Sequence, residues 1–233
     1  MRKIFTLSCA AWALLALATS GAAGTLAVTN YSEHNGDGQA SGGEFNYWDN
    51  TYNGSGNNHL DNAFLTGGTG LLTDGAVAAC DWSFSQACSN AWVGWLISSN
   101  GVAAYGPQTV TFNFGSNVNI NSITFNFADD GGYGGVGIPT GVTVAVSGST
   151  VPWTPSCYFC SFGPNGGHDF TLSGLNLTGN AASITFSQTS TDWVFLSEVT
   201  FNGTSTVPEP ASSALLGSAL AGLAVVMCLR FRG

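Results

Sequence analysis

The sequence predicts an all-β fold, an antiparallel β-sandwich or jelly roll, flanked by an N-terminal signal helix and a C-terminal transmembrane helix. Apolar and polar residues alternate through the second half of the chain, and turns rich in Gly, Asn, Ser and Pro separate the alternating stretches. No convincing amphipathic helix lies between the two terminal apolar segments. The region between them, about 180 residues, is long enough for one domain with a sizeable core.

The alternation of period two is clearest in three stretches, whose apolar residues are Val110, Phe112 and Phe114, then Ile123, Phe125 and Phe127, then Val142, Val144 and Val146. Four more segments have the composition of short strands: 91–97, 168–173, 182–188 and 193–201. In the last segment Val194 and Leu196 are out of phase with Val199 and Phe201, so we expect a strand that is buried on both faces or bulged.

Residues 29–70 are crowded with Asn, Gly, Ser and Tyr and show little periodicity. We expect a long loop region with one or two short strands. Within it, Asp49 to Gly54 begins like a calcium loop of the EF-hand type, but Leu60 stands where a bidentate Glu is required. We interpret this stretch as a turn-rich loop.

The N-terminus has the pattern of a secretory signal peptide. Arg2 and Lys3 precede an apolar stretch from Ile4 to Ala18, and small residues follow from Thr19 to Gly24. We expect signal peptidase to remove residues 1–24, so that the mature chain starts near Thr25. The expected organisation is a signal peptide at 1–24, a β-sandwich domain at 25–203 and a sorting tail at 204–233.

An uncharged run from Ala211 to Leu229 lies near the C-terminus. As a helix it would be about 28 Å long, which is just enough to cross a bilayer. Arg230 and Arg232 follow it, and a basic cluster beside a membrane segment stays cytoplasmic. The region before Ala211 is therefore expected outside the cytoplasm, in agreement with the signal peptide.

The region between the terminal segments contains no lysine or arginine, because the four basic residues are Arg2, Lys3, Arg230 and Arg232. The chain has 13 Asp and Glu residues. Phosphate and sulfate groups are normally bound by Arg or Lys, so nucleic acid, acidic polysaccharide and anionic lipid are poor partners. The charge favours cations or neutral ligands, although an acidic surface can also serve solubility alone.

Four cysteines remain once Cys9 leaves with the signal peptide and Cys228 is assigned to the membrane run: Cys80, Cys88, Cys157 and Cys160. In an oxidising compartment an even number indicates two disulfides, and three pairings are open. Short loops close most readily, which favours Cys80 with Cys88 and Cys157 with Cys160. A four-cysteine zinc site is the alternative, although only the second pair has ligand spacing.

The end of the chain carries Val207-Pro208-Glu209-Pro210, then the apolar run, then Arg230-Phe231-Arg232. This order resembles the PEP-CTERM sorting signal of Gram-negative bacteria that make extracellular polysaccharide. The resemblance implies recognition by an exosortase, cleavage near the motif, and an inner-membrane precursor that is released or transferred to the cell surface, outer envelope or medium. An ordinary tail anchor behind a Pro-rich hinge is the alternative.

Residues 71–201 carry a second resemblance, in Leu72-Thr73-Asp74-Gly75, Trp92-Val93-Gly94-Trp95, the hairpin 110–127, residues 137–144 and the closing segment 193–199. In this order they resemble galactose-binding-like β-sandwiches, the group of discoidin domains and carbohydrate-binding modules. The resemblance implies a structural calcium held by Asp74 and Glu198, with Thr73 or Asp81 adding oxygen ligands. The alternative is a solvent-facing Glu198 on a bulge.

Aromatic residues in the expected loops are candidates for stacking on a sugar. The candidates are Tyr47, Trp48, Tyr52, Trp82, Tyr133, Trp153, Tyr158 and Phe159, and of these Tyr47, Trp48, Tyr52 and Trp153 are the selected ligand-binding residues. We assign Trp92, Trp95 and Trp193 to the core. Asp129-Asp130-Gly131-Gly132 is expected to form a solvated hairpin tip, with a metal site as the alternative.

No catalytic arrangement stands out, because His34, His59 and His168 lie in polar segments without a nucleophile motif. The sequence therefore predicts an exported, exosortase-sorted, non-enzymatic envelope or matrix protein, which binds neutral carbohydrate such as exopolysaccharide with the help of structural Ca²⁺. A structural or adhesive matrix protein without a ligand pocket is the first alternative. A glycan hydrolase is the second.

Overall fold

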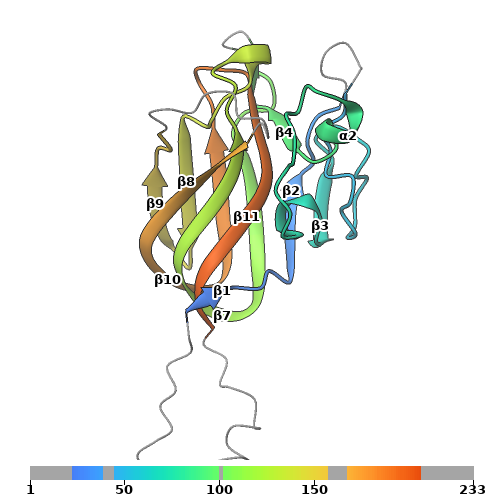
Figure 1. Cartoon of the computed structure of the whole chain (residues 1–233). Coiled ribbons are helices and arrows are strands. Elements are labelled where there is room, and N and C mark those ends of the chain that lie inside the picture. The colour runs from blue at the N-terminus through green and yellow to red at the C-terminus, as the bar shows by residue number, and fades with distance from the viewer. Residues whose placement is uncertain (1–22, 39–44, 100–101, 157–166, 206–233) are drawn as a thin grey trace, which may run out of the picture. The chain divides into compact units, whose positions relative to one another are not determined.

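Two long strands, β7 (Gln108–Ala128) and β10 (Gly167–Ser187), organise the structure and take part in both of its layers (Figure 1). The computed structural model describes residues 23–38, 45–99, 102–156 and 167–205. The predicted signal peptide, sorting motif and transmembrane run, and the pair Cys157 and Cys160, lie outside these residues. No helix in the described ranges is long and apolar enough to span a membrane.

Apart from β11, the other elements are short. They are β1 (Gly24–Thr25), β2 (Asn30–His34), β3 (Phe64–Gly68), η1 (Leu71–Thr73), α2 (Gln86–Ser89), β4 (Val93–Leu96), β5 (Ser98–Ser99), β6 (Val102–Ala103), η2 (Tyr133–Gly135), β8 (Gly141–Val146), β9 (Ser149–Trp153) and β11 (Trp193–Ser205). The main sheet path is β1-β11-β7-β10-β8-β9, with β2 and β4 joined to β7 and β11, and all pairings between these strands are antiparallel. The prediction of an antiparallel all-β fold is confirmed.

Irregularities let β7 and β10 turn from one layer into the other. On β7, residues 114–117 are inserted between the pairs Asn113–Ala181 and Val118–Gly179. Gly115 adopts φ +73 there, a conformation that glycine tolerates best. Because each long strand bends, residues 108–114 and 181–187 lie in one layer and residues 118–128 and 167–173 in the other (Figure 1).

Aromatic rings fill the space between the layers. Phe201 of β11 contacts Phe114 of β7 edge to face, with ring centroids 5.0 Å apart. Phe127 contacts Phe186 of β10 at 5.7 Å, and Trp95 of β4 stacks on Phe186 at 5.8 Å. All five side chains are at most 5% exposed. The alternating residues of the three strongest predicted strands all belong to this main core, as predicted.

Strand β11 explains the out-of-phase pattern seen in the sequence. Its register against β7 shifts between Leu196 and Glu198, so the expected bulge is present. Val194 and Leu196 face the main core, whereas Phe195 belongs to a second cluster with Tyr47, Ala78, Trp82, Trp92, Ala128 and Val136. The strand is therefore buried on both faces, because the loop segments before β4 cover its outer side.

The predicted disulfide between Cys80 and Cys88 is present and closes a loop that contains α2. Ser85 caps α2, since its hydroxyl accepts a hydrogen bond from the backbone N–H of Cys88. The bridge and the cap together hold a segment that has little regular structure of its own. This loop supplies Trp82 to the second cluster, and Ala78, which lies just before the loop, also belongs to that cluster.

We expect the double substitution Cys80→Ser/Cys88→Ser to lower the free energy of unfolding by about 2–3 kcal/mol, because the open loop gains entropy in the unfolded chain. Denaturant unfolding of the variant beside the wild type measures this difference. Peptide mapping without reductant tests the pairing independently. A bond from Cys80 or Cys88 to Cys157 or Cys160 would contradict the structure.

Candidate functional site

Two of the four selected aromatic residues are buried rather than exposed. Tyr47 is 0% exposed and its ring lies 4.4 Å from that of Phe195, while Tyr52 is 6% exposed and its hydroxyl donates to the carbonyl of Tyr31. Their prediction as surface stacking residues is wrong. The loop in which they lie folds back over the strands, and their rings supply apolar area that an irregular segment otherwise lacks.

The other two selected residues are half-buried and lie on different elements. Trp48 donates from Nε1 to Asp61 Oδ1 at 2.7 Å. Trp153 lies in β9, not in a loop, and its ring stacks on Phe125 with centroids 5.7 Å apart. Both rings have structural partners, and the described contacts do not join the four selected residues into one aromatic groove. Among the residues assigned to the core, Trp92 and Trp95 are confirmed, whereas Trp193 is partly buried.

A polar cavity of about 320 Å³ provides a better candidate site. Its lining comes from β5, the η2 turn and the loop between β10 and β11, and consists of Ser98, Gly132, Gly135, Thr189, Ser190, Thr191 and Asp192. This volume is at the small end of the range of about 300–1,000 Å³ that is typical of small-molecule sites. The walls offer hydroxyl, carboxylate and backbone groups, so the cavity suits a small polar ligand.

One buried amide fixes the loop that forms most of the cavity wall. Gln188 is 4% exposed, and its Nε2 donates to the carbonyl of Ile138 at 2.8 Å. Its Oε1 accepts from the backbone N–H groups of Thr189, Ser190 and Thr191 at 2.9, 3.0 and 3.3 Å. Because these bonds exist before any ligand binds, the loop needs little ordering on binding.

Hydrogen bonds also connect the 189–192 loop to η2 and to β5. The N–H of Asp192 donates to the carbonyl of Gly135 at 2.8 Å, and the hydroxyl of Ser98 donates to the carbonyl of Thr191 at 3.0 Å. Thr191 Oγ1 is buried without a hydrogen-bond partner in the described part of the chain. A buried hydroxyl is normally hydrogen-bonded, so Thr191 Oγ1 is an unsatisfied polar atom behind the cavity wall.

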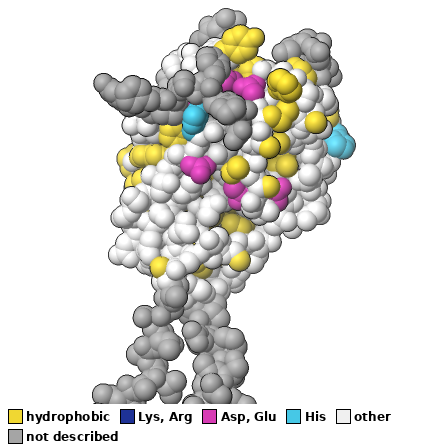
Figure 2. Space-filling model, viewed as in Figure 1, with side chains coloured by type: hydrophobic (Ala, Val, Ile, Leu, Met, Phe, Trp, Pro, Cys, Tyr) yellow, Lys and Arg dark blue, Asp and Glu magenta, His cyan; other side chains and the backbone are white. Residues whose placement is uncertain are grey.

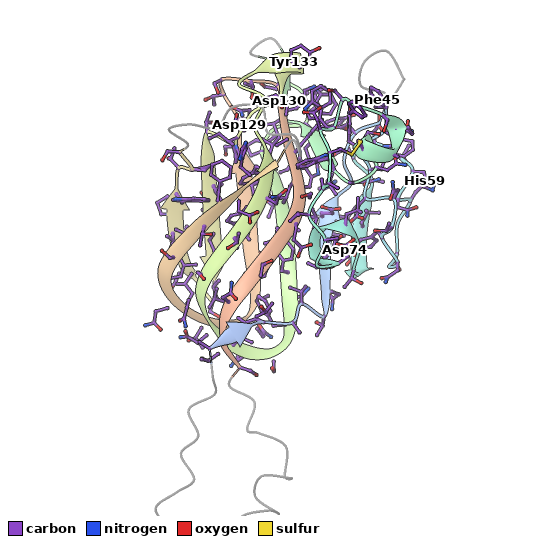
Figure 3. All side chains as sticks on the ribbon, viewed as in Figure 1. Phe45, His59, Asp74, Asp129, Asp130 and Tyr133 are labelled. Carbon is purple, nitrogen blue, oxygen red and sulfur yellow. A yellow bond between two sulfur atoms is a disulfide. The ribbon has the colours of Figure 1, made fainter. Side chains whose placement is uncertain are left out.

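Tyr133 stands beside the cavity, because it lies in η2 next to the lining residues Gly132 and Gly135. Its side chain is 65% exposed. Figure 3 shows Tyr133 at the end of the β-domain that lies opposite β1. An exposed phenol ring offers a flat apolar face together with a polar hydroxyl. The sequence analysis included Tyr133 among the loop aromatic residues but did not predict the cavity beside it. The one local sign of the cavity in the sequence is the cluster of Ser, Thr and Asp at residues 189–192.

The two residues selected for calcium lie near each other beside η1. Glu198 is 8% exposed, which rules out the solvent-facing alternative, and its Oε2 accepts from the N–H of Gly75 at 3.2 Å. Burial, and then the charge of Asp74, raise the pKa of Glu198 to about 8. Thr73 Oγ1 is buried without a partner in the described ranges. These three side chains offer only oxygen atoms, which fits Ca²⁺.

Asp81 does not complete this set, as the sequence had allowed, because its carboxyl lies beside Asp130 instead. Asp130 is 1% exposed, so the expected solvated hairpin tip is wrong for this residue. No group of three His, Cys, Asp or Glu side chains suited to a metal occurs among the described residues. Any cation here must therefore take part of its coordination from hydroxyl, backbone or water oxygens.

Buried carboxyl groups occur elsewhere too, and one of them belongs to Glu33. It lies on the inward face of β2, is 1% exposed, and neither carboxyl oxygen accepts a hydrogen bond from a described residue. Its polar neighbour is Asp49, which accepts from Tyr31 Oη and from the N–H of Leu71. Burial and then the charge of Asp49 raise the pKa of Glu33, so a protonated Glu33 can donate to Asp49.

We expect stability to fall as the pH rises from about 4.5, the range in which an unfolded Glu loses its proton, because the folded chain retains the proton on Glu33. Glu33→Gln removes this titration. At pH 8 with chelator present, the variant should melt about 3 °C or more above the wild type, since one kcal/mol corresponds to about 2–4 °C in a domain of this size. At pH 4 the two should differ little.

Scanning calorimetry across this pH range measures the effect, with Asp169→Asn as the control for loss of one negative charge at an exposed strand position. A Glu33→Gln variant that melts below the wild type at every pH would contradict this account of Glu33.

The visible face in Figure 2 carries carboxylate and apolar side chains and no lysine or arginine, as the sequence requires. The site is therefore a small polar cavity with an exposed tyrosine beside it, in an acidic domain.

Comparison with known proteins gives one family match and several structural resemblances. The family 32 carbohydrate-binding module of C. perfringens NanJ, solved with galactose, is 16% identical over 48% of this chain and 75% of that one, with TM-score 0.33. The family 32 module of AlyQ, solved with 4,5-unsaturated mannuronic acid, is 14% identical over 76% and 97%, with TM-score 0.36. The lectin domain of lectinolysin, complexed with Lewis B antigen, is 11% identical over 57% and 81%, with TM-score 0.36. No curated protein matches the sequence.

The family match covers most of the chain. A model of the DS-like domain of discoidin domain-containing receptors 1 and 2 matches residues 27–203. This range contains both layers of the sandwich, the cavity and the residues selected for calcium, and it agrees with the discoidin resemblance found in residues 71–201. The chain therefore belongs to the family of discoidin domain receptor DS-like domains.

Proposed function

We propose that this chain is an exported, non-enzymatic surface protein that binds a neutral carbohydrate in the polar cavity beside Tyr133. The observation that carries the proposal is a small cavity whose walls are hydroxyl, carboxylate and backbone groups, held in place by Gln188 before a ligand arrives. Sugars are recognised by such hydrogen-bonding groups together with an aromatic face, and Tyr133 offers that face.

The charge of the domain selects the class of sugar. Asp192 lines the cavity, and no lysine or arginine occurs between residues 4 and 229. An anionic sugar would meet the carboxylate of Asp192 in a domain that contains no lysine or arginine, so binding would cost electrostatic energy. A neutral exopolysaccharide meets no such penalty, and its hydroxyls can donate to the carboxylate of Asp192 and to the hydroxyl oxygen of Ser190, whose own proton is donated to Gln188.

The cavity also favours binding over catalysis. Glycoside hydrolysis generally uses two carboxyl groups that face each other across the scissile bond. The cavity lining contains one carboxylate, Asp192, among serine, threonine and glycine. This composition supports a binding module rather than a hydrolase.

Export and sorting form the second part of the proposal. The signal peptide at 1–24 and the motif Val207-Pro208-Glu209-Pro210 indicate signal peptidase and exosortase as the processing enzymes. The Cys80–Cys88 disulfide supports an oxidising compartment, since such bonds rarely persist in the cytosol. The mature domain would then act at the cell surface, in the outer envelope or in the extracellular matrix.

A structural Ca²⁺ at Asp74 and Glu198 is the third part. The ion would neutralise the buried Glu198 and give the hydroxyl of Thr73 a partner, and it would tie the turn after η1 to β11. Asp74 supplies the second carboxylate. The role is structural, because the cavity lining contains neither residue.

We expect Tyr133→Ala to weaken binding to the cognate neutral polysaccharide about 10-fold or more. The reason is that packing of the Tyr133 ring on the apolar face of a sugar contributes on the order of 1.4 kcal/mol or more to the binding free energy. Asp192→Asn should also weaken binding, since it replaces an ionised acceptor while keeping the side-chain shape. A glycan array first identifies the ligand, and titration calorimetry then gives the affinities.

Phe84→Ala is the matched control, because Phe84 is an aromatic residue that is 82% exposed and does not line the cavity. Equal losses in Tyr133→Ala and Phe84→Ala would contradict the assignment of the site. Absence of binding to every neutral glycan would instead support the structural or adhesive alternative.

We expect chelation of Ca²⁺ to lower the melting temperature of the wild type, and Glu198→Gln to reduce that drop, because the variant loses one carboxylate ligand and also the buried charge. Thermal unfolding with and without chelator measures both effects. A melting curve of the wild type that chelator leaves unchanged would remove the calcium part of the proposal without affecting the carbohydrate part.

A further inference from the structure

Trp82 lies against the turn that carries Tyr133. Its side chain is 4% exposed, and its indole N–H donates to Oδ2 of Asp130, three residues before Tyr133. The ring of Trp82 lies 6.5 Å from the ring of Tyr133, a separation at which aromatic rings attract each other. Figure 3 shows Asp130 and Tyr133 at the same end of the domain. Trp82 therefore contacts the turn at two points.

Gly134, the middle residue of η2, lets the turn pack directly on the indole ring. A Cβ atom at this position would lie 2.6 Å from Cη2 of Trp82, which is closer than two carbon atoms can approach without a shift. Gly134 also adopts φ +61, a conformation that glycine tolerates best. The backbone of η2 and the ring of Trp82 are thus in close contact, with no room for a side chain between them.

Backbone hydrogen bonds connect η2 to the cavity wall. The N–H of Tyr133 donates to the carbonyl of Asp130 at 3.0 Å, and the N–H of Asp192 donates to the carbonyl of Gly135 at 2.8 Å. Gly135 and Asp192 both line the cavity. A displacement of η2 would therefore move the aromatic ring of Tyr133 and the carboxylate of Asp192, which are the two side chains proposed to bind the sugar.

Trp82 is itself held from the side of the domain. The Cys80–Cys88 disulfide closes the loop in which Trp82 lies. The ring of Trp82 contacts Phe195 of β11 edge to face, with centroids 5.3 Å apart, and belongs to the second cluster. This support exists before any ligand binds, and a preformed wall reduces the cost of ordering the site on binding.

We propose that Trp82 is a positioning residue of the carbohydrate site, which holds η2, and with it Tyr133 and Asp192, in the arrangement that binds the sugar. This inference rests on the proposed function of the cavity. The described lining of the cavity does not include Trp82, so its effect passes through η2. If Trp82 only filled the second cluster, its replacement would lower stability without a specific effect on η2.

Trp82→Phe keeps an apolar ring and removes the donor to Asp130. In the purified full-length chain, we expect backbone amide hydrogen exchange over residues 131–136 to become about 10-fold faster or more, because the turn loses a hydrogen bond to a carboxyl group. Mass spectrometry of the exchanged chain measures this rate. Affinity for the neutral polysaccharide identified by glycan array should fall about 5-fold or more in titration calorimetry, because the ligand must then order the turn.

Trp92→Phe is the matched control. Trp92 belongs to the same second cluster and is 0% exposed, and its indole N–H donates to the carbonyl of Cys80 rather than to the turn after β7. This variant should lower the melting temperature and leave both the exchange over residues 131–136 and the affinity unchanged. If Trp82→Phe fails to fold by circular dichroism, Gly134→Ala replaces it, since the added methyl group forces η2 away from Trp82 and should produce the same two changes.

Exchange over residues 131–136 that Trp82→Phe, or its replacement Gly134→Ala, leaves unchanged would overturn the proposal. Faster exchange with unchanged affinity, or equal effects in Trp92→Phe, would do the same. Failure of the proposed function has a different signature, because the wild type then binds no neutral glycan. That result overturns the role of Trp82 in a carbohydrate site even where exchange still shows that Trp82 holds η2.

Discussion

The domain buries several carboxyl groups although it contains no lysine or arginine to pair with them. Glu33, Asp37, Asp49, Asp130 and Glu198 are all at most 8% exposed, and no lysine or arginine occurs between residues 4 and 229. An isolated buried carboxylate is so costly that the group either finds hydrogen-bond donors, retains a proton or binds a cation. Each of these interactions connects a buried carboxyl group to another segment of the chain. The acidic residues therefore help to determine where the irregular segments contact the strands.

Neutral donors satisfy part of this requirement. Asp49 accepts from the hydroxyl of Tyr31 and from the N–H of Leu71, which attaches the long loop to β2 and η1. Asp37 accepts from the N–H of Leu96, although burial still raises its pKa to about 7. The remaining oxygens, on Glu33, Asp37 and Asp130, have no donor in the described part of the chain. Burial raises the pKa of all three groups, so we expect the stability of the domain to depend on pH.

The strands could be predicted from the sequence because their signal is local. Val110, Phe112 and Phe114 point inward at every second position, and the bulge in β11 was visible as a change of phase. The Cys80–Cys88 bond was also predictable, since the two residues are close in sequence. Tyr47 and Tyr52 were misjudged because a tyrosine in a loop without periodicity gives no sign of whether its ring covers the core or faces water. The cavity could not be predicted, because Ser98, Gly135 and Asp192 come from distant segments of the chain. The β4–β11 pairing brings Ser98 to Asp192, and the bridge between Val136 and Trp193 brings Gly135 there.

Location outside the cytoplasm, as proposed from the two ends of the chain, would suit a domain with buried carboxyl groups and few cation ligands. Extracellular modules use Ca²⁺ sites with dissociation constants of about 10⁻⁴–10⁻³ M, so a site built from two carboxylates and a hydroxyl does not need the full set of ligands that an intracellular sensor requires. The absence of lysine and arginine, which leaves the buried carboxyl groups without a cationic side chain of that kind, also disfavours binding of anionic polymers at the cavity. Binding of a neutral polysaccharide then carries the smallest electrostatic cost among matrix polymers. The acidity of the domain and the proposed selectivity of its cavity therefore have the same physical origin.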